Sequence, residues 1–184
     1  KYNTITKEFK SLYDTLDDFH ISDIIIAKEG NLLISTFSNG LYESNNFGQV
    51  NNTKGLPKDL RIQDLLLSSN NELWIATYND GVYTIKNNEI SHLFNNPPHD
   101  NSVNYNDIIC VVEDRQKNIW LGTDGGGLSL YKSNQKPIYR ISNQDIPVEM
   151  AVDVTRSIST DKKGNIWIGT SGKGLTSINP NKQN

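Results

Sequence analysis

The sequence contains little of what several classes of protein require. Its 184 residues include one cysteine, Cys110, so no disulfide can form within the chain. The formal net charge is -3 and there is no basic block, which argues against a nucleic-acid partner or an anionic membrane surface. The longest apolar run, residues 108–112, has the length of a strand and is far below the ~18 residues of a membrane-spanning helix. We therefore expect no nucleic acid and no direct membrane contact.

Motifs for catalysis, metal binding and cofactor binding are also missing. The histidines show no metal-ligand spacing and are interpreted as loop or edge residues: His20, His92 and His99. The glycine clusters at 125–127 and 172–174 precede expected strands, whereas a phosphate-binding loop precedes a helix. Asp124 lacks the regular carboxylate spacing of calcium loops. We expect no enzyme activity, no metal and no cofactor, although residues that meet only in space escape this reasoning.

What the sequence does contain is one segment repeated four times without a gap, at residues 21–44, 62–85, 108–131 and 155–178. Each copy has an apolar strand, a polar turn, a second apolar strand ending in Thr, and a Gly four residues after that Thr. The aligned glycines are separated by 41, 46 and 47 residues: Gly40, Gly81, Gly127 and Gly174. Periods of roughly 40–50 residues with several short strands indicate propeller blades.

The predicted fold is all-β, a β-propeller segment of about four repeats of four-stranded antiparallel blades. Weak fourth strands are expected around residues 47–50, 90–94 and 138–141, and the last blade lacks its own outer strand. The whole chain, residues 1–184, is expected to form a single propeller segment. It divides into an outer strand and loop (1–19), three blades (20–60, 61–103 and 104–153) and a partial blade (154–184).

The N-terminal segment leaves more than one structure open. Residues 2–12 resemble residues 131–141, which end a third strand and form a fourth. Such a strand either completes the last blade and closes a small ring, or belongs to an open arc whose ends associate. Apolar residues at helical spacing leave an amphipathic helix over residues 7–19 as an alternative.

Several prominent residues are interpreted as parts of the scaffold. Large residues share one aligned mid-strand position, which indicates packing: Leu33, Trp74, Trp120 and Trp167. Cys110 is interpreted as a thiol that fills a strand position, because no activating partner lies near it in sequence. Lys117 occupies a turn position where the other copies have Gly or Asn, so we expect that turn to differ.

The candidate functional residues lie where the copies differ. The turns between second and third strands, and the connections at 59–61, 95–106 and 145–156, should meet on one face of the blades. Variation on a repeated frame is typical of binding specificity. The residues predicted to bind a ligand are Tyr78, Asp80, Tyr105, Asp124 and Arg156.

The repeat resembles that of the two-component-regulator propeller family. The resemblance rests on residues 164–170 with Gly174-Leu175 and on residues 118–123 with Gly127-Leu128, with a softer match at residues 71–77. It implies the extracytoplasmic, periplasmic sensor of a hybrid two-component regulator, which binds an oligosaccharide and signals to a histidine kinase in the parent protein. The implied partners are the remaining blades or other copies of the propeller. The family has no short ligand-binding motif that could be carried onto this sequence.

The sequence leaves two other functions open. One is a structural or protein-interaction propeller without a small-molecule ligand. The other is an enzyme, such as a lyase or a lactonase, built on a propeller.

Overall fold

The computed structural model describes residues 2–9, 19–27, 30–44, 49–96, 102–132, 138–142, 152 and 154–180. Every named element within these residues is a β-strand, which confirms the predicted all-β class. Among the described residues, no helix reaches the length and apolarity of a membrane span. The chain divides into two compact units, Lys1–Arg61 and Ile62–Asn184.

The first unit contains a short hairpin and one four-stranded sheet. The hairpin pairs β1 (Tyr2–Asn3) with β2 (Glu8–Phe9). The antiparallel sheet contains β3 (Ile21–Ile26), β4 (Leu32–Thr36), β5 (Leu41–Ser44) and β6 (Val50–Asn52), in chain order.

The structure differs from the sequence prediction at two strands of this unit. The fourth strand starts at Val50 rather than ending there, because residues 50–52 are the ones that pair with β5. A single outer strand was expected over residues 2–12, but residues 2–9 form a hairpin instead. The turn of this hairpin is closed by Asn3, whose Oδ1 accepts a hydrogen bond from Ile5 N at 2.9 Å. Residues 10–18, which hold most of the alternative helix, lie outside the described residues.

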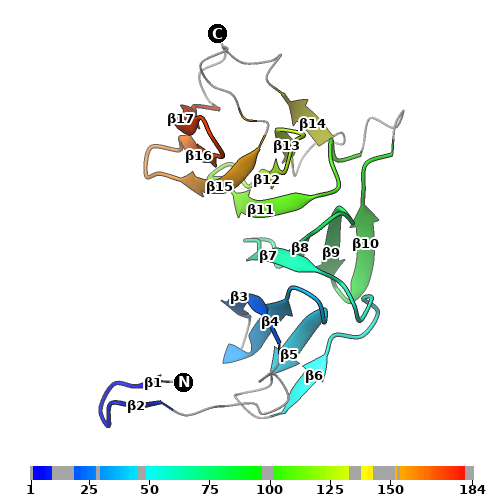
Figure 1. Ribbon diagram of the computed structural model, residues 1–184, viewed down its shortest axis with the longest axis vertical. Helices are drawn as coiled ribbons and strands as arrows, with labels where there is room; N and C mark the ends of the chain where they lie inside the picture. Colours follow the sequence, from blue (N-terminus) through cyan, green and yellow to red (C-terminus); the bar gives the residue numbers. More distant parts are fainter. Residues whose placement is uncertain are drawn as a thin grey trace. The chain divides into compact units, whose positions relative to one another are not determined.

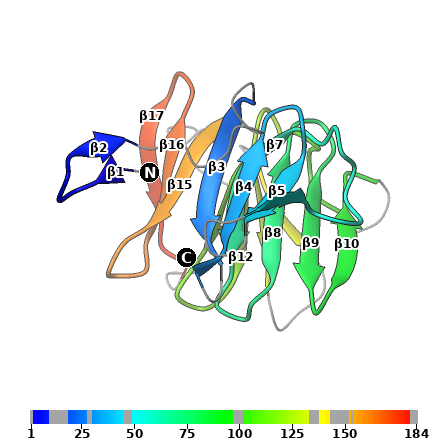
Figure 2. The ribbon, with the colours of Figure 1, turned by 90° about the horizontal axis from the view of Figure 1, so that it is seen from below.

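The second unit contains three consecutive sheets (Figure 1). The first has β7 (Ile62–Leu67), β8 (Leu73–Thr77), β9 (Val82–Lys86) and β10 (Glu89–Leu93), seen side by side in Figure 2. The second has β11 (Ile108–Glu113), β12 (Ile119–Thr123), β13 (Leu128–Tyr131) and β14 (Ile138–Ile141). The third has three strands, as predicted: β15 (Thr155–Thr160), β16 (Ile166–Thr170) and β17 (Gly174–Ile178).

The Thr–Gly signature of the repeat closes the turn between the second and third strands. In each sheet the Thr hydroxyl donates to the carbonyl of the Gly four residues later, at distances of 2.9, 2.8, 2.9 and 3.1 Å in chain order. Each Gly has a φ between 70° and 79°, a backbone conformation that residues other than Gly, Asn and Asp rarely adopt. A Cβ at Gly81 or Gly127 would also overlap the carbonyl oxygen of Leu93 or Ile141. The signature is therefore structural.

The core of the second unit forms where one sheet packs on the next. Trp74 of β8 lies in a cluster with Val111, Ile119 and Leu121 of the following sheet. Trp120 of β12 lies in the corresponding cluster with Val152, which precedes the third sheet, and with Ile166 and Ile168 of β16. The packing role is confirmed for Trp74 and Trp120, which are buried, whereas Trp167 is 39% exposed.

The turn that contains Lys117 does not differ from its equivalents. Lys117 has φ 65°, and the aligned residues have the same left-handed backbone: Gly30 at 81°, Asn71 at 61° and Gly164 at 83°. The expectation of a different turn was wrong because the flanking pair of strands imposes the conformation. Lys117 N donates to Asp114 O at 3.0 Å, as Asn71 N does to Ser68 O at 2.9 Å.

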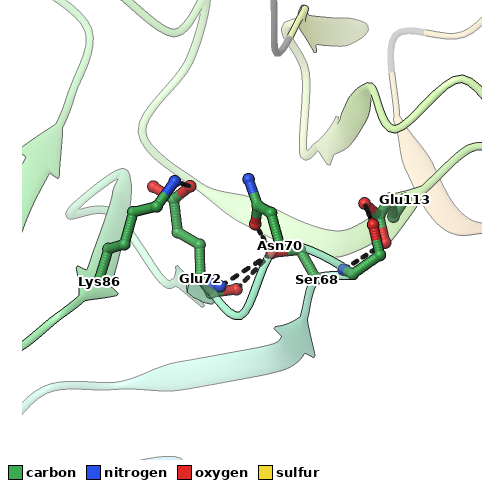
Figure 3. A network of polar contacts seen from close by, with 6 residues as sticks. Ser68, Asn70, Glu72, Lys86 and Glu113 are labelled. Atoms are coloured by element: carbon green, nitrogen blue, oxygen red, sulfur yellow. Dashed lines mark hydrogen bonds and ion pairs between the residues drawn. The ribbon is translucent and has the colours of Figure 1, made fainter.

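Polar side chains join the first two sheets of this unit at the β7–β8 turn (Figure 3). The Glu113 carboxylate, at the end of β11, accepts from the backbone N and the hydroxyl of Ser69, each at 2.7 Å. Within the turn, the Ser68 hydroxyl donates to Glu72 O at 2.7 Å, and Lys86 lies 3.4 Å from the Glu72 carboxylate. This end of the sheets lies opposite the turns that carry the candidate binding residues, since successive turns of a meander alternate between ends.

Candidate ligand-binding face

The turns and connections expected on one face do meet in the second unit. Gly81, in the β8–β9 turn, donates its N–H to Asn106 O of the connection that precedes β11, at 2.8 Å. In the next sheet, Asp124 N of the β12–β13 turn donates to Asp107 O at 3.0 Å. The connection therefore runs between the two turns and brings Tyr105 to the middle of this face.

Tyr105 lies over the glycines of the β12–β13 turn. A Cβ at Gly126 would sit 2.6 Å from the Tyr105 Cβ, and a Cβ at Gly125 would sit 3.7 Å from the Tyr105 Cζ. A side chain at 126 would therefore displace Tyr105, whereas a Cβ at 125 would be in ordinary van der Waals contact with the ring. The Tyr105 side chain remains 43% exposed, so it covers bare backbone and also faces solvent.

Two asparagines that the sequence reasoning missed hold the backbone on either side of Tyr105. Asn104 Nδ2 donates to Gly126 O and to Leu128 O, the latter at 3.2 Å. Asn104 Oδ1 accepts from the Ser129 hydroxyl at 2.6 Å, and Asn106 Oδ1 accepts from Asn95 N, also at 2.6 Å. These bonds fix Tyr105 before any ligand arrives, which lowers the entropy cost of binding.

Asp124 and Arg156 form an ion pair next to the Tyr105 position. Arg156 Nη2 lies 3.7 Å from Asp124 Oδ1, and both side chains are substantially exposed. An isolated β-bridge between Asp124 and Val154 holds the two segments together. Exposed pairs of this kind contribute only about 0–1 kcal/mol, so exchanging one partner for a ligand costs little. Tyr105, Asp124 and Arg156 are thus brought together around one turn.

Asp80 belongs to a different cluster, on β9 and β10. Its Oδ2 accepts from the Tyr83 hydroxyl at 2.8 Å, and its Oδ1 lies 3.5 Å from His92 Nε2. The Tyr83 and His92 rings stack with centroids 4.1 Å apart, because the two residues are paired across the strands. Burial, together with the hydrogen bond to Asp80, raises the pKa of Tyr83 to about 12. The Asp80 carboxylate is therefore hydrogen-bonded within this cluster, while its side chain remains 46% exposed.

The remaining candidates are placed as follows. Tyr78 is the first residue of the β8–β9 turn and is half-buried. His92 lies on the edge strand β10 and His20 precedes β3, which confirms the interpretation of both, whereas His99 lies outside the described residues.

Cys110 is not part of the binding face. Its thiol is buried between the second and third sheets, beside Gly122 and Ile158. Burial raises the pKa of this thiol to about 12, with a smaller contribution from the charge of Asp64. A thiol in this environment stays protonated and is a poor nucleophile, which confirms that Cys110 fills a strand position.

Comparison with known proteins identifies the repeat. The family described as two component regulator propeller matches residues 102–125 and 150–172, which overlap the third and fourth copies. The predicted resemblance is therefore confirmed: these two copies match the repeat of the two-component-regulator propeller family. A search of curated proteins found no match to the chain.

The fold is similar to those of several solved structures. The extracellular domain of the putative hybrid two component system BT3049 from B. thetaiotaomicron has a TM-score of 0.75 and 21% identity, over 94% of this chain and 23% of that one. The extracellular domain of BT4673 from the same organism has a TM-score of 0.74 and 20% identity, over 100% of this chain and 25% of that one. Virginiamycin B lyase from Staphylococcus aureus has a TM-score of 0.66 and 16% identity, over 91% of this chain and 58% of that one.

These similarities confirm the predicted β-propeller segment. At these identities they establish the fold alone. The chain spans about a quarter of the length of the two extracellular domains.

Proposed function

We propose that this chain is part of the ligand-sensing propeller of a two-component regulator and that its turn face binds an oligosaccharide outside the cytoplasm. The observation that carries the proposal is the arrangement of Tyr105 on Gly125 and Gly126, beside the Asp124–Arg156 pair. The family match and the extracellular two-component domains among the similar structures support the sensor role.

The chemistry of this face suits a sugar chain. An aromatic ring fixed on backbone offers a rigid apolar surface on which the flat face of a pyranose ring can stack. Asp124 supplies carboxylate acceptors and Arg156 supplies guanidinium donors for sugar hydroxyls, and both remain accessible to solvent. A few polar groups around an apolar platform are typical of sites that select a ligand by its orientation.

Signalling in the parent protein would follow from differential binding. A ligand that contacts the Tyr105 connection and the start of β15 together favours the arrangement of blades in which both contacts are made. We propose that this preference changes the relative placement of neighbouring domains and is passed to a histidine kinase elsewhere in the parent protein.

We propose binding rather than catalysis for this chain. The polar groups beside Tyr105 are exposed to solvent, whereas catalytic groups usually lie in desolvated sites. Similarity to a lyase is similarity of fold, on which function does not depend. The alternative of a propeller without a small-molecule ligand is separated from our proposal by the following measurement.

The test is calorimetric titration of the chain with a panel of neutral plant and host oligosaccharides. We expect at least one ligand to bind, with its affinity reduced tenfold or more by Tyr105→Ala. The matched control is Tyr139→Ala, since Tyr139 is an exposed tyrosine on β14, 4.4 Å from the Lys132 amino group and away from the turn. Absence of binding across the panel, or equal affinities for the two variants, would refute the proposed function.

A further inference from the structure

Three of the turns between second and third strands contain an Asn-Gly or Asp-Gly pair: Asn39-Gly40, Asp80-Gly81 and Asp124-Gly125. In such a pair the amide nitrogen of the Gly can attack the side-chain carbonyl carbon of the residue before it, because the Gly has no side chain to obstruct the approach. The reaction needs an amide nitrogen that is accessible to water and free of hydrogen bonds. The structure therefore decides which of the three pairs can react.

Hydrogen bonds hold the Gly amide in the first two pairs. Gly40 N donates to Leu60 O at 3.0 Å, and Gly81 N donates to Asn106 O at 2.8 Å. Both glycines are buried, and each is the aligned Gly whose carbonyl closes its turn. An attack by either nitrogen would break the bond between the turn and the neighbouring connection and leave a buried carbonyl without its donor.

The third pair lies two positions earlier in its turn. Asp124 directly follows Thr123, so the residue after it is Gly125 and not the aligned Gly127. Within the part of the chain that the structure describes, the Gly125 N–H donates to no acceptor, and Gly125 is exposed. The nitrogen of this pair is therefore available for attack in the folded protein.

The Asp124 side chain is only loosely held. It is 36% exposed, and its ion-pair partner Arg156, at 3.7 Å, is 54% exposed. Exposed pairs of this kind contribute little, so the carboxyl group can turn away from Arg156 at low cost. The backbone on the other side of the residue is fixed, since Asp124 N donates to Asp107 O at 3.0 Å. The carboxyl group can thus reach the peptide that follows it without unfolding of the turn.

We propose that Asp124-Gly125 is a site of spontaneous isomerisation on the turn face. The Gly125 nitrogen attacks Asp124 Cγ, the amide proton and a hydroxyl of the carboxyl group leave as one water molecule, and a five-membered succinimide ring forms. A water molecule then opens the ring. Cleavage at Cγ restores Asp, whereas cleavage at the main-chain carbonyl gives isoaspartate, in which the backbone runs through Cγ. The reaction needs no oxidant and leaves the mass of the chain unchanged.

Isoaspartate at this position would alter the candidate binding site. It adds one methylene group to the backbone of the turn and moves the carboxylate that pairs with Arg156. The added group lies two residues before Gly126, on which Tyr105 packs. This consequence rests on the proposed function: we expect the isomerised chain to bind an oligosaccharide at least tenfold more weakly.

The test is incubation of the intact chain near neutral pH for several weeks, followed by digestion and mass spectrometry with fragmentation that distinguishes isoaspartate from aspartate. In the folded chain, isoaspartate should form several-fold faster at position 124 than at position 80 or 39. In denaturant, position 39 should become the fastest, because an amide loses ammonia more readily than a carboxyl group loses water. Absence of isoaspartate at position 124 of the folded chain, or equal rates at positions 80 and 124, would overturn the proposal.

Asp124→Asn allows a comparison in which the leaving group is the same. Both Asn-Gly pairs of this variant lose ammonia, so a difference between them reports only the state of the Gly amide. We expect position 124 to react at least tenfold faster than Asn39, and a rate no higher than that of Asn39 would contradict the proposal. The control is Asp124→Glu, which should give no product because its longer side chain would have to close a six-membered ring. Circular dichroism melting checks that both variants are folded.

These measurements use no ligand, so they decide the isomerisation whatever the result of the oligosaccharide titration. The effect on binding is measured separately, by calorimetric titration of the isomerised chain after its separation from the unmodified chain. If no oligosaccharide binds either form, the proposed function fails while the isomerisation site stands or falls by mass spectrometry alone.

Discussion

Lys117 offers a direct test of how the repeat imposes its backbone on an unsuitable residue. Its φ of 65° lies in the left-handed region, which costs a residue with a Cβ about 1–2 kcal/mol. Replacement by Gly removes that cost but adds about 0.5–1 kcal/mol of backbone entropy to the unfolded chain. We therefore expect Lys117→Gly to raise the free energy of unfolding by about 0.5–1 kcal/mol.

Lys117→Asn should have a similar effect, because Asn71 already holds φ 61° at the aligned position. The measurement is urea unfolding followed by tryptophan fluorescence, with a higher midpoint and an unchanged slope. The melting temperature should rise by roughly 1–4 °C, given the size of the chain.

The matched control lies in the same turn. Arg115 is exposed and does not have a positive φ, so Arg115→Gly carries only the entropy cost and should lower stability by about 0.5–1 kcal/mol. Opposite signs for the two Gly variants are the expected result. If Lys117→Gly is destabilising to the same extent as Arg115→Gly, the left-handed strain assigned to this turn is wrong.

Three further predictions follow from the packing of the sheets. Asp114→Ala should cost about 2–4 kcal/mol in urea unfolding, because this buried carboxylate accepts hydrogen bonds from two backbone amides and two side chains. Asp161→Ala should cost less, because Asp161 accepts the equivalent hydrogen bonds but is only partly buried. Burial raises the pKa of Cys110 to about 12, so its contribution to stability should be complete below pH ~9 and decline toward pH ~12, and thiol reagents at neutral pH should modify it only in denaturant. Gly122→Ala should cost about 1–3 kcal/mol in the same unfolding assay, because a Cβ there would sit 2.5 Å from Thr155 Cγ2.

The repeat could be predicted in detail because its determinants are local. The Thr–Gly bond spans four residues, and the shared mid-strand position of the Trp residues was enough to indicate packing. Trp167 shows the limit of this reasoning. Its local sequence matches that of Trp120, yet its exposure differs because burial of this side chain is decided by the sheet that covers it.

The candidate site was predictable only in part, for a related reason. The sequence indicated that Gly125 and Gly126 belong to a turn, but a glycine does not show which side chain packs on it, so the position of Tyr105 required the structure. Asp80 was placed in the site by its turn position. The β9–β10 register puts His92 opposite Tyr83, whose hydroxyl donates to the Asp80 carboxylate, and this contact between strands could not be predicted from the turn alone.

The structure separates stability from specificity within a single turn. The Thr–Gly hydrogen bond and the left-handed Gly recur in all four sheets, whereas the three residues between Thr and Gly are different each time. In one turn those residues include Asp80, in the next Asp124 followed by two glycines that support Tyr105. Because the bond that closes the turn does not involve the three variable side chains, they can change without loss of the fold. A binding face assembled from such turns can therefore be altered one blade at a time, which is the physical basis for expecting ligand selectivity there rather than in the strands.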